Sequence, residues 1–246
     1  MTLRTALLAS FIALLAGCSS APKGDPSTAE GSFALAEKYE KDERYEEALA
    51  QFTSVRNKHP YSSLATEAEL RVAEIHFKRE DYPEAQGAYE SFKELHPSYA
   101  RIDYITFRLG LSIFKQLPST IDRDLALANK GLLYFEEVIT SFPKSEYVAG
   151  AQEHKGKILE MLAEKELYIA DFYFKREKYD SALGRYEDLL DHYPNSRFAP
   201  RALMGGAIAA ARAKDESKSR ILLSELERRF AGSKELRETK EALRAD

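Results

Sequence analysis

An internal repeat limits the folds open to this chain more than any other feature. Five positions occupied by small, aromatic and proline residues recur 37 residues apart, first as Ala36, Tyr45, Ala48, Phe52 and Pro60, then as Ala73, Tyr82, Ala85, Tyr89 and Pro97. A shift of 97 from the second set reaches Ala170, Tyr179, Ala182, Tyr186 and Pro194. Looser copies contain Gly110, Gly131, Phe135 and Pro143, and then Ala207 and Leu223. Each copy therefore predicts one unit of a repeat array.

The spacing inside each copy indicates a pair of antiparallel helices. Small residues such as Ala48 let two helices approach closely, and an aromatic residue one turn later fills the space against the next helix. The proline ends the second helix because it lacks an amide hydrogen. Thirteen residues after four of the prolines comes another small residue: Ala73, Gly110, Gly156 and Ala207. We therefore predict an all-α solenoid of about five tetratricopeptide-like helix pairs.

Two longer intervals between prolines, of 46 and 51 residues, indicate departures from this regular array. The first interval contains an insertion, Leu117 to Asp124, which we expect to be a surface loop. The second has no Gly or Pro between Lys157 and Leu183, so we predict one long helix from Ser145 to about Arg176 in the fourth repeat. It divides the array into N-terminal repeats 1–3 (residues 33–143) and C-terminal repeats 4–5 (residues 144–246). Serines two residues past each stop are expected N-caps: Ser62, Ser145, Ser196 and Ser233.

The N-terminus carries the pattern of a lipoprotein signal peptide. Arg4 precedes an apolar run, Ala6 to Ala16, that is too short to span a bilayer. Leu15-Ala16-Gly17-Cys18 ends this run and resembles a bacterial lipobox. We therefore expect residues 1–17 to be removed, Cys18 to carry a covalent lipid, and residues 18–32 to be a flexible tether. Ser19 after the cysteine favours transport to the outer membrane.

Composition and motifs argue against nucleic-acid binding and against catalysis. Lys and Arg number 36 against 40 Asp and Glu, a mildly acidic balance that is unsuited to nucleic acid. The sequence contains no phosphate-binding glycine loop, zinc-protease motif or lipase motif. His59, His96 and His192 lie at matching helix ends. A histidine there interacts favourably with the negative end of the helix dipole, and we prefer this role to metal binding. We expect no enzyme activity, no metal and no cofactor.

A solenoid without catalytic motifs is expected to bind other molecules on its surface. Its concave face is lined mainly by the first helix of each pair, and the polar candidates there are Arg71, Lys78, Tyr104, Arg108, Lys175 and Arg176. Basic groups on such a wall could capture a peptide carboxylate. The alternative for each of them is an ordinary solvent-exposed side chain.

The lipobox, the short tether and the five stretched repeats together resemble the BamD (ComL) family. Its specific segments here are HPYSSLATEAELRVAEIHFKREDYPEA, HPSYARIDYITFRLGLSIF, DRDLALA and EKELYIADFYFKREKYDSALGRYEDLLDHYPNS. The resemblance implies a lipid-anchored scaffold of the β-barrel assembly machine on the periplasmic face of the outer membrane of a Gram-negative bacterium. Its implied partners are the periplasmic domains of the barrel-forming subunit, other assembly lipoproteins and unfolded outer-membrane protein substrates.

The resemblance also assigns roles to residues in the two halves of the array. The N-terminal repeats would receive the C-terminal signals of substrates, which makes Arg71, Lys78, Tyr104 and Arg108 the candidate signal face. The C-terminal repeats would dock the barrel-forming subunit. Pro200 stands where a basic docking residue is expected, so its neighbours Arg197 and Arg201 are the candidates. The insertion at Leu117 to Asp124 is shorter than expected for the family.

Two other functions compete with this interpretation. The chain could be a different tetratricopeptide lipoprotein, acting as a secretin pilotin or as a cell-envelope coordinator. The long helix and the family segments disfavour this alternative. The third hypothesis, an enzyme, has no motif in its favour.

Overall fold

The computed structural model describes residues 25–121 and 123–245, and every regular element in these ranges is an α-helix. The predicted helical solenoid is confirmed. The chain forms two compact units, of which the first ends at Arg79 and the second begins at Glu80. Cys18, the signal peptide and residues 18–24 of the tether lie outside the described residues, and the last four residues of the predicted tether, 29–32, belong to the first helix. The grouping into repeats 33–143 and 144–246 stays a prediction.

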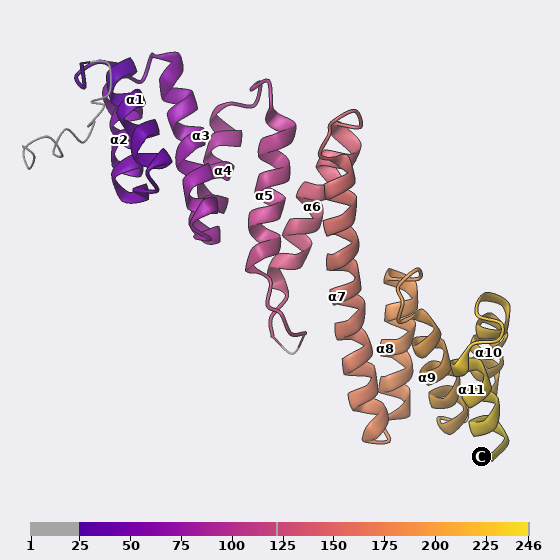
Figure 1. Ribbon diagram of the computed structural model, residues 1–246. Coiled ribbons are helices and arrows are strands. Elements are labelled where there is room, and N and C mark those ends of the chain that lie inside the picture. The colour runs from indigo at the N-terminus through magenta and orange to yellow at the C-terminus, as the bar shows by residue number, and fades with distance from the viewer. Residues whose placement is uncertain (1–24, 122, 246) are drawn as a thin grey trace, which may run out of the picture. The chain divides into compact units, whose positions relative to one another are not determined.

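The first unit contains α1 (Ala29–Lys41), α2 (Tyr45–Lys58) and α3 (Ser63–Lys78). Each helix packs on the next, as Figure 1 shows in indigo and violet. The rings of Phe33 and Phe52 meet edge to face, 5.2 Å apart, at the centre of this core. Ala36 and Ala48 are fully buried on the facing sides of α1 and α2, so the small residues of the repeat lie at the helix crossing.

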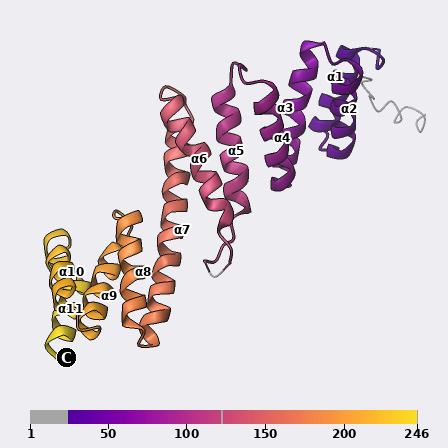
Figure 2. The ribbon, with the colours of Figure 1, turned by 180° about the vertical axis from the view of Figure 1, so that it is seen from behind.

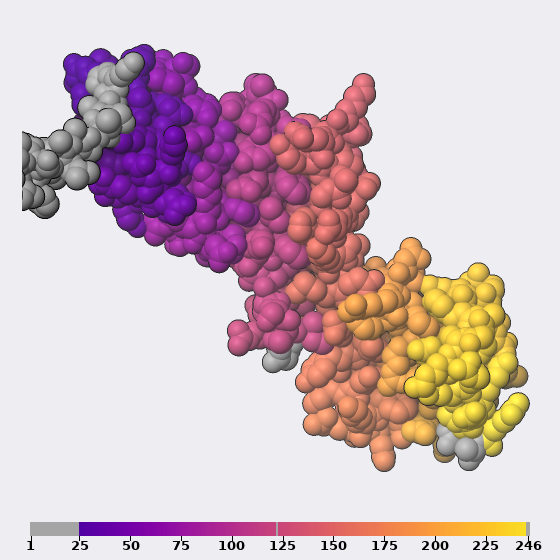
Figure 3. Space-filling model, in the orientation of Figure 1, coloured from indigo at the N-terminus to yellow at the C-terminus, as the bar shows by residue number. Residues whose placement is uncertain are grey.

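The second unit contains eight helices among its described residues: α4 (Tyr82–Leu95), α5 (Ile102–Gln116), α6 (Ala126–Ser141), α7 (Val148–Lys175), α8 (Tyr179–His192), α9 (Ala199–Arg212), α10 (Glu216–Arg229) and α11 (Lys234–Ala245). Helices adjacent in the chain pack against each other, and α11 also packs on α9 (Figures 1 and 2). The loop between α5 and α6 falls on the predicted insertion. Figure 3 shows this loop in magenta as a lobe beside the orange end of α7.

The repeat positions inferred from the spacing are buried. The small residues Ala85, Gly131 and Ala182 lie in the core, as do the aromatic residues Tyr89 and Tyr186. A Cβ on Gly131 would lie 3.1 Å from Ile158 Cδ1, which explains glycine at this crossing.

Gly156 does not occupy the buried position that its distance from Pro143 predicts. It is exposed, and a Cβ there would meet no atom within 4 Å. The buried small residues of this helix are instead Ala151, Ala163 and Ala170. The reason is the length of α7. Its N-terminal half packs in one core and its C-terminal half in another, so the spacing of the shorter repeats does not apply to it.

The predicted long helix is confirmed as α7, whose 28 residues span about 42 Å. Ala151 and Ile158 on its N-terminal half share a core with α6. Ala163 and Ala170 on its C-terminal half share a different core with α8 and α9. One helix therefore serves two successive packing layers, and its C-terminal half extends past α6.

The turns inside four of the repeats use a left-handed residue that is not glycine. These residues are Glu43, Glu80, Glu177 and Lys214, with φ between 57° and 65°. In the first repeat the amide of Arg44 donates to the carbonyl of Tyr39 at 2.8 Å, which is the long bond of a Schellman cap. Lys178 donates to Tyr173 in the same way. The turn chemistry therefore repeats at the spacing of the sequence.

Two of the four serines predicted as N-caps do not cap the helix that follows them. Ser62 is the N-cap of α3, and Ser233 accepts the amide of Leu236 at 3.1 Å just before α11. Ser145 and Ser196 lie two residues before the observed caps of α7 and α9. They accept amides of the preceding turn, and their hydroxyls donate to Asp103 and Glu160 on earlier helices. These two serines therefore join consecutive helix pairs.

Candidate functional site

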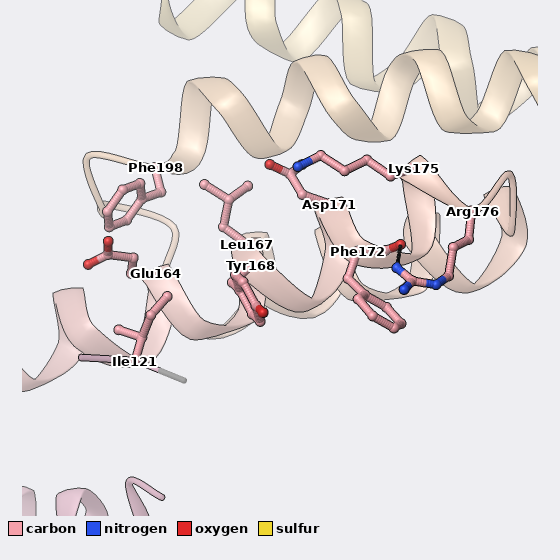
Figure 4. A pocket seen from close by; sticks show the side chains of 9 residues that line it. All are labelled: Ile121, Glu164, Leu167, Tyr168, Asp171, Phe172, Lys175, Arg176 and Phe198. Carbon is pink, nitrogen blue, oxygen red and sulfur yellow. Dashed lines mark hydrogen bonds between the residues drawn. The ribbon is translucent and has the colours of Figure 1, made fainter. Parts of the chain in front are cut away.

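The most distinctive surface feature of the second unit is a groove of about 390 Å³ along the C-terminal half of α7. We call it the α7 groove, and its lining residues are Ile121, Glu164, Leu167, Tyr168, Asp171, Phe172, Lys175, Arg176 and Phe198. Figure 4 shows Ile121, Glu164 and Phe198 gathered at one end and Lys175 and Arg176 at the other. The groove exists because this half of α7 extends past the helix pair that precedes it.

Two aromatic residues form the open side of the groove. Tyr168 and Phe172 are one helical turn apart and point the same way in Figure 4. Their exposed fractions are 54% and 42%, which are high for large apolar side chains. Aromatic residues of this kind are enriched at protein interfaces. The groove therefore has the composition of a docking surface.

The acidic residues of the groove form ion pairs with two arginines at the start of α9 and just before it. Glu164 lies 3.7 Å from Arg197, and Asp171 lies 3.4 Å from Arg201. Asp171 also accepts a 2.5 Å hydrogen bond from the buried hydroxyl of Tyr186. Burial, and then this bond to the carboxylate, raise the pKa of Tyr186, so its proton stays in place at physiological pH.

The opposite end of the groove is basic. The Arg176 guanidinium lies 3.5 Å from the centroid of the Phe172 ring and donates to the Phe172 carbonyl at 3.4 Å. Within the described part of the chain, neither Lys175 nor Arg176 has an acidic partner. This end therefore offers positive charge next to exposed aromatic surface, which suits a ligand that combines apolar and acidic groups.

The candidate signal residues of the first unit are engaged with one buried carboxylate. Glu40, only 6% exposed, accepts from Arg71 at 2.5 Å and also from Lys78. These bonds connect α1 with α3. A buried carboxylate needs such partners, so Arg71 and Lys78 have a structural role here.

Tyr104 and Arg108 lie together one turn apart on α5, in the second unit. Arg108 Nε donates to the hydroxyl of Tyr89 at 3.1 Å, and its guanidinium lies 5.8 Å from the Tyr104 ring centroid. Arg101 approaches the Tyr104 ring at 4.4 Å, and the Tyr147 ring lies 5.5 Å from it. The structure therefore brings Tyr104 and Arg108 together, and Arg71 with Lys78, as two separate pairs.

The candidate docking residues Arg197 and Arg201 lie beside the α7 groove. Arg197 is the more exposed of the two, with 69% of its side chain accessible. Phe198, between them, lines the groove itself.

The sequence predicted Arg197 and Arg201, which lie beside the groove, and also named Lys175 and Arg176, which line it, but Tyr168, Phe172 and Phe198 were missed. A signal was present, since Tyr168 and Phe172 lie off the stripe of Leu167, Ala170 and Phe174 that faces the core.

Within residues 25–121 and 123–245, no group of His, Cys, Asp or Glu is arranged to hold a metal ion. Among the helices of these same residues, none is both long and apolar enough to cross a bilayer.

Comparison with known proteins identifies the chain's relatives. The sequence profile of a family described as "YfiO: Outer membrane lipoprotein" matches residues 27–220. A Vibrio cholerae protein named outer membrane protein assembly factor BamD is 24% identical over 202 residues, which cover 78% of this chain and 84% of that protein. The protein of the same name from Rickettsia prowazekii is 28% identical over 160 residues, covering 65% of this chain and 63% of the relative.

Among solved structures, the TPR2AB domain of yeast Sti1 in complex with pHSP90 aligns with a TM-score of 0.48 at 15% identity, covering 90% of this chain and 85% of that one. PilF of Pseudomonas aeruginosa aligns with a TM-score of 0.39 at 18% identity, covering 88% and 83% of the two chains.

Proposed function

Because the chain belongs to the YfiO family of outer membrane lipoproteins, we propose that it acts as an assembly factor for outer membrane proteins. The observation that carries this proposal is the family match over residues 27–220, which extends over parts of both compact units. The relatives named BamD support the same role. The protein works as a scaffold of the β-barrel assembly machine, without catalysis of its own and without a cofactor.

The protein is held at the periplasmic face of the outer membrane by a covalent lipid on Cys18. The lipobox residues Leu15 to Cys18 and the description of the family support this anchor. A Cys18→Ala variant is expected to keep its helical circular dichroism and to leave the membrane fraction. A lipid-modified N-terminal peptide in the mass spectrum of the parent protein checks the modification directly. An unmodified Cys18 peptide contradicts the anchor.

The α7 groove, with Arg197 and Arg201 beside it, docks the periplasmic domains of the barrel-forming subunit. The exposed rings of Tyr168 and Phe172 and the basic end at Lys175 and Arg176 support this assignment. Apolar surface at the centre and charge at the edge are the usual anatomy of such an interface.

A pull-down from outer membranes in mild detergent tests both the function and the docking surface. The tagged parent protein is expected to recover a barrel protein with repeated periplasmic domains, together with other small lipoproteins. A double variant, Tyr168→Ser with Phe172→Ser, is expected to lose at least nine-tenths of the barrel protein.

The matched control for this pull-down is Leu133→Ser with Ile221→Ser. It removes two similarly exposed apolar side chains outside the groove and is expected to recover the parent amount. Recovery of a secretin in place of the barrel protein would overturn the proposed function. Equal recovery by both double variants would overturn only the docking surface.

Of the four candidate signal residues, Tyr104 and Arg108 are the better placed to meet an unfolded substrate. Arg71 and Lys78 are already bound to Glu40, whereas the Tyr104 ring lies between two arginines. A photo-crosslinking residue at Tyr104 is expected to trap unfolded barrel substrates. The same residue at Lys78 is the comparison and is expected to trap less.

A further inference from the structure

The start of α1 in the first unit lies beside the turn that joins α2 to α3. The start of α1, Ser27 to Glu30, and the turn between α2 and α3, Asn57 to Ser62, line one open depression of about 820 Å³. They lie together because α1 and α2 are antiparallel, so that the end of α2 returns to the start of α1. Whatever lies near the N-terminus of the folded chain therefore also lies near this turn.

The turn presents an aromatic side chain that has no packing role. Tyr61 is fully accessible, at 101% of the reference value, and is the most exposed of the large apolar residues described. The second repeat has Tyr99 at its corresponding turn, where the ring packs edge to face on Phe92 at 5.1 Å. The fold can therefore cover a tyrosine at this kind of turn, and it leaves Tyr61 uncovered.

Two positively charged side chains lie close to Tyr61 in the sequence, at the end of α2. Lys58 and Arg56 are both exposed, and in the described ranges neither forms an ion pair with an acidic residue. Arg56 donates only to the neighbouring amide oxygen of Asn57, at 3.2 Å. The acidic residue that lines the depression is Glu30, and Asp25, just before the lining residues in the chain, accepts a hydrogen bond from the amide of Ser27 at 2.9 Å. The turn thus exposes two cations next to a tyrosine.

The length of chain before the fold limits how far this surface can lie from a lipid on Cys18. Asp25 is the first described residue and follows Cys18 by seven positions. A fully extended chain of this length spans at most about 25 Å. The depression at Ser27 to Glu30, and Tyr61 with it, is therefore confined near the bilayer.

We propose that Tyr61 and Lys58 contact the headgroup region of the membrane and orient the first unit on it. Tyrosine partitions into this region because its ring is apolar and its hydroxyl stays hydrated. A lysine or arginine near an anionic surface gains about 1 kcal/mol, close to a fivefold change in binding. The surface recognised is that of an anionic phospholipid bilayer. This inference rests on the lipid anchor of the proposed function.

The absence of tryptophan from the chain makes the contact directly measurable, because Tyr61→Trp introduces a unique fluorophore. The lipidated full-length variant is reconstituted into vesicles of phosphatidylcholine and phosphatidylglycerol, with part of the lipid brominated on its acyl chains. The emission is expected to shift to shorter wavelength and to be quenched by the brominated lipid. The matched control is Tyr168→Trp, at an exposed tyrosine of the second unit, and it is expected to show neither effect.

Sedimentation with the vesicles separates a failed contact from a failed anchor. Protein that sediments but shows no quenching at residue 61, or equal quenching at residues 61 and 168, overturns the contact and leaves the anchor intact. Protein that does not sediment overturns the anchor, and the contact with it.

A charge reversal tests the role of Lys58 independently of the fluorophore. In the Cys18→Ala protein, Lys58→Glu is expected to weaken binding to the anionic vesicles by fivefold or more. Lys41→Glu makes the same change of charge at the opposite end of α1 and is expected to have a smaller effect. Equal effects of the two substitutions would show that only net charge matters, and would overturn the assignment to this turn.

Discussion

The same four residues, Phe-Lys-Arg-Glu, end the first helix of two repeats and meet different surroundings. In the first unit Lys78 binds the buried Glu40, and Arg79 binds Glu46 at 2.6 Å. At the end of α7 the equivalent Lys175 and Arg176 have no acidic partner in the described chain and lie in the groove. The difference arises because α3 has α1 and α2 beside it, whereas α7 extends past its preceding pair. Position in the array, rather than local sequence, therefore decides whether a cation binds a buried carboxylate or lines an open groove.

The largest effect is expected from disturbing the support of the α7 groove. A Cβ on Gly205 would lie 2.3 Å from Cζ of the buried Tyr186, whose hydroxyl holds Asp171. Gly205→Ala is therefore expected to lower the free energy of unfolding by about 2–3 kcal/mol, as measured by urea denaturation. Gly184→Ala is the control, because its added Cβ meets no atom within 4 Å. Equal stability of the two variants would show that Tyr186 moves aside freely.

The contrast between the lysine at the end of α3 and the lysine at the end of α7 is tested by removing one of these cations at a time. Lys78→Met leaves Glu40 with Arg71 alone and is expected to lower the free energy of unfolding by about 1–2 kcal/mol. Lys175→Met removes the equivalent charge from the groove and is expected to change it by less than about 0.5 kcal/mol. Chemical denaturation of both variants makes the comparison. A similar loss at the two positions would mean that Lys175 has a structural partner after all.

The N-terminal half of α7 provides a pH-dependent contrast with its C-terminal half. His154 lies among the rings of Phe107, Phe114 and Phe135, the nearest at 4.7 Å. Burial, helped by Lys157 and Lys115 and opposed by Glu153, lowers the pKa of His154. The unfolded chain therefore binds more protons as the pH falls through the ordinary histidine range, so this residue destabilises the fold on acidification.

His154→Phe is expected to remove that part of the pH dependence. Its stability relative to the parent protein should increase between pH 7 and pH 5, as followed by thermal unfolding at each pH. His192→Phe, at an exposed helix end, is the control. A constant difference across this range would mean that His154 is protonated alike in the folded and unfolded chains.

The smallest expected effect concerns a property that the two Phe-Lys-Arg-Glu segments share. Their glutamates, Glu80 and Glu177, both adopt the left-handed conformation, with φ of 64° and 58°. Glycine adopts this conformation without steric cost, so Glu80→Gly and Glu177→Gly are each expected to raise the free energy of unfolding by about 0.5–1 kcal/mol. Differential scanning calorimetry should show two similar increases. A gain in stability at only one of the two positions would mean that the backbone conformations at Glu80 and Glu177 are not equally strained.

The sequence was sufficient for those features that depend on spacing. The repeat predicted the buried positions Ala48, Ala85 and Ala182, and the run without Gly or Pro predicted α7. The caps at Ser145 and Ser196 were misplaced because an additional turn separates these serines from their helices. The left-handed glutamates were not predicted, since glycine is the usual signal for that conformation.

The candidate site was harder to infer than the fold. Arg197 and Arg201 were named, but the groove beside them also depends on which side chains line it from α7 and from Ile121, and these come together only in the folded chain. The burial of Glu40 depends on α1 packing beside α3, so no spacing along the chain indicates that it pairs with Arg71 and Lys78.

The continuity of α7 has a consequence for how this sequence can change during evolution. Between separate repeats an inserted residue is absorbed by a turn, as the insertion at Leu117 to Asp124 illustrates. Within α7 each inserted or deleted residue would rotate one half against the other by about 100° and shift it by about 1.5 Å. Ala151 and Ile158 would then lose their register with Ala163 and Ala170. Substitutions can accumulate along this helix, whereas changes in its length are expected to be eliminated.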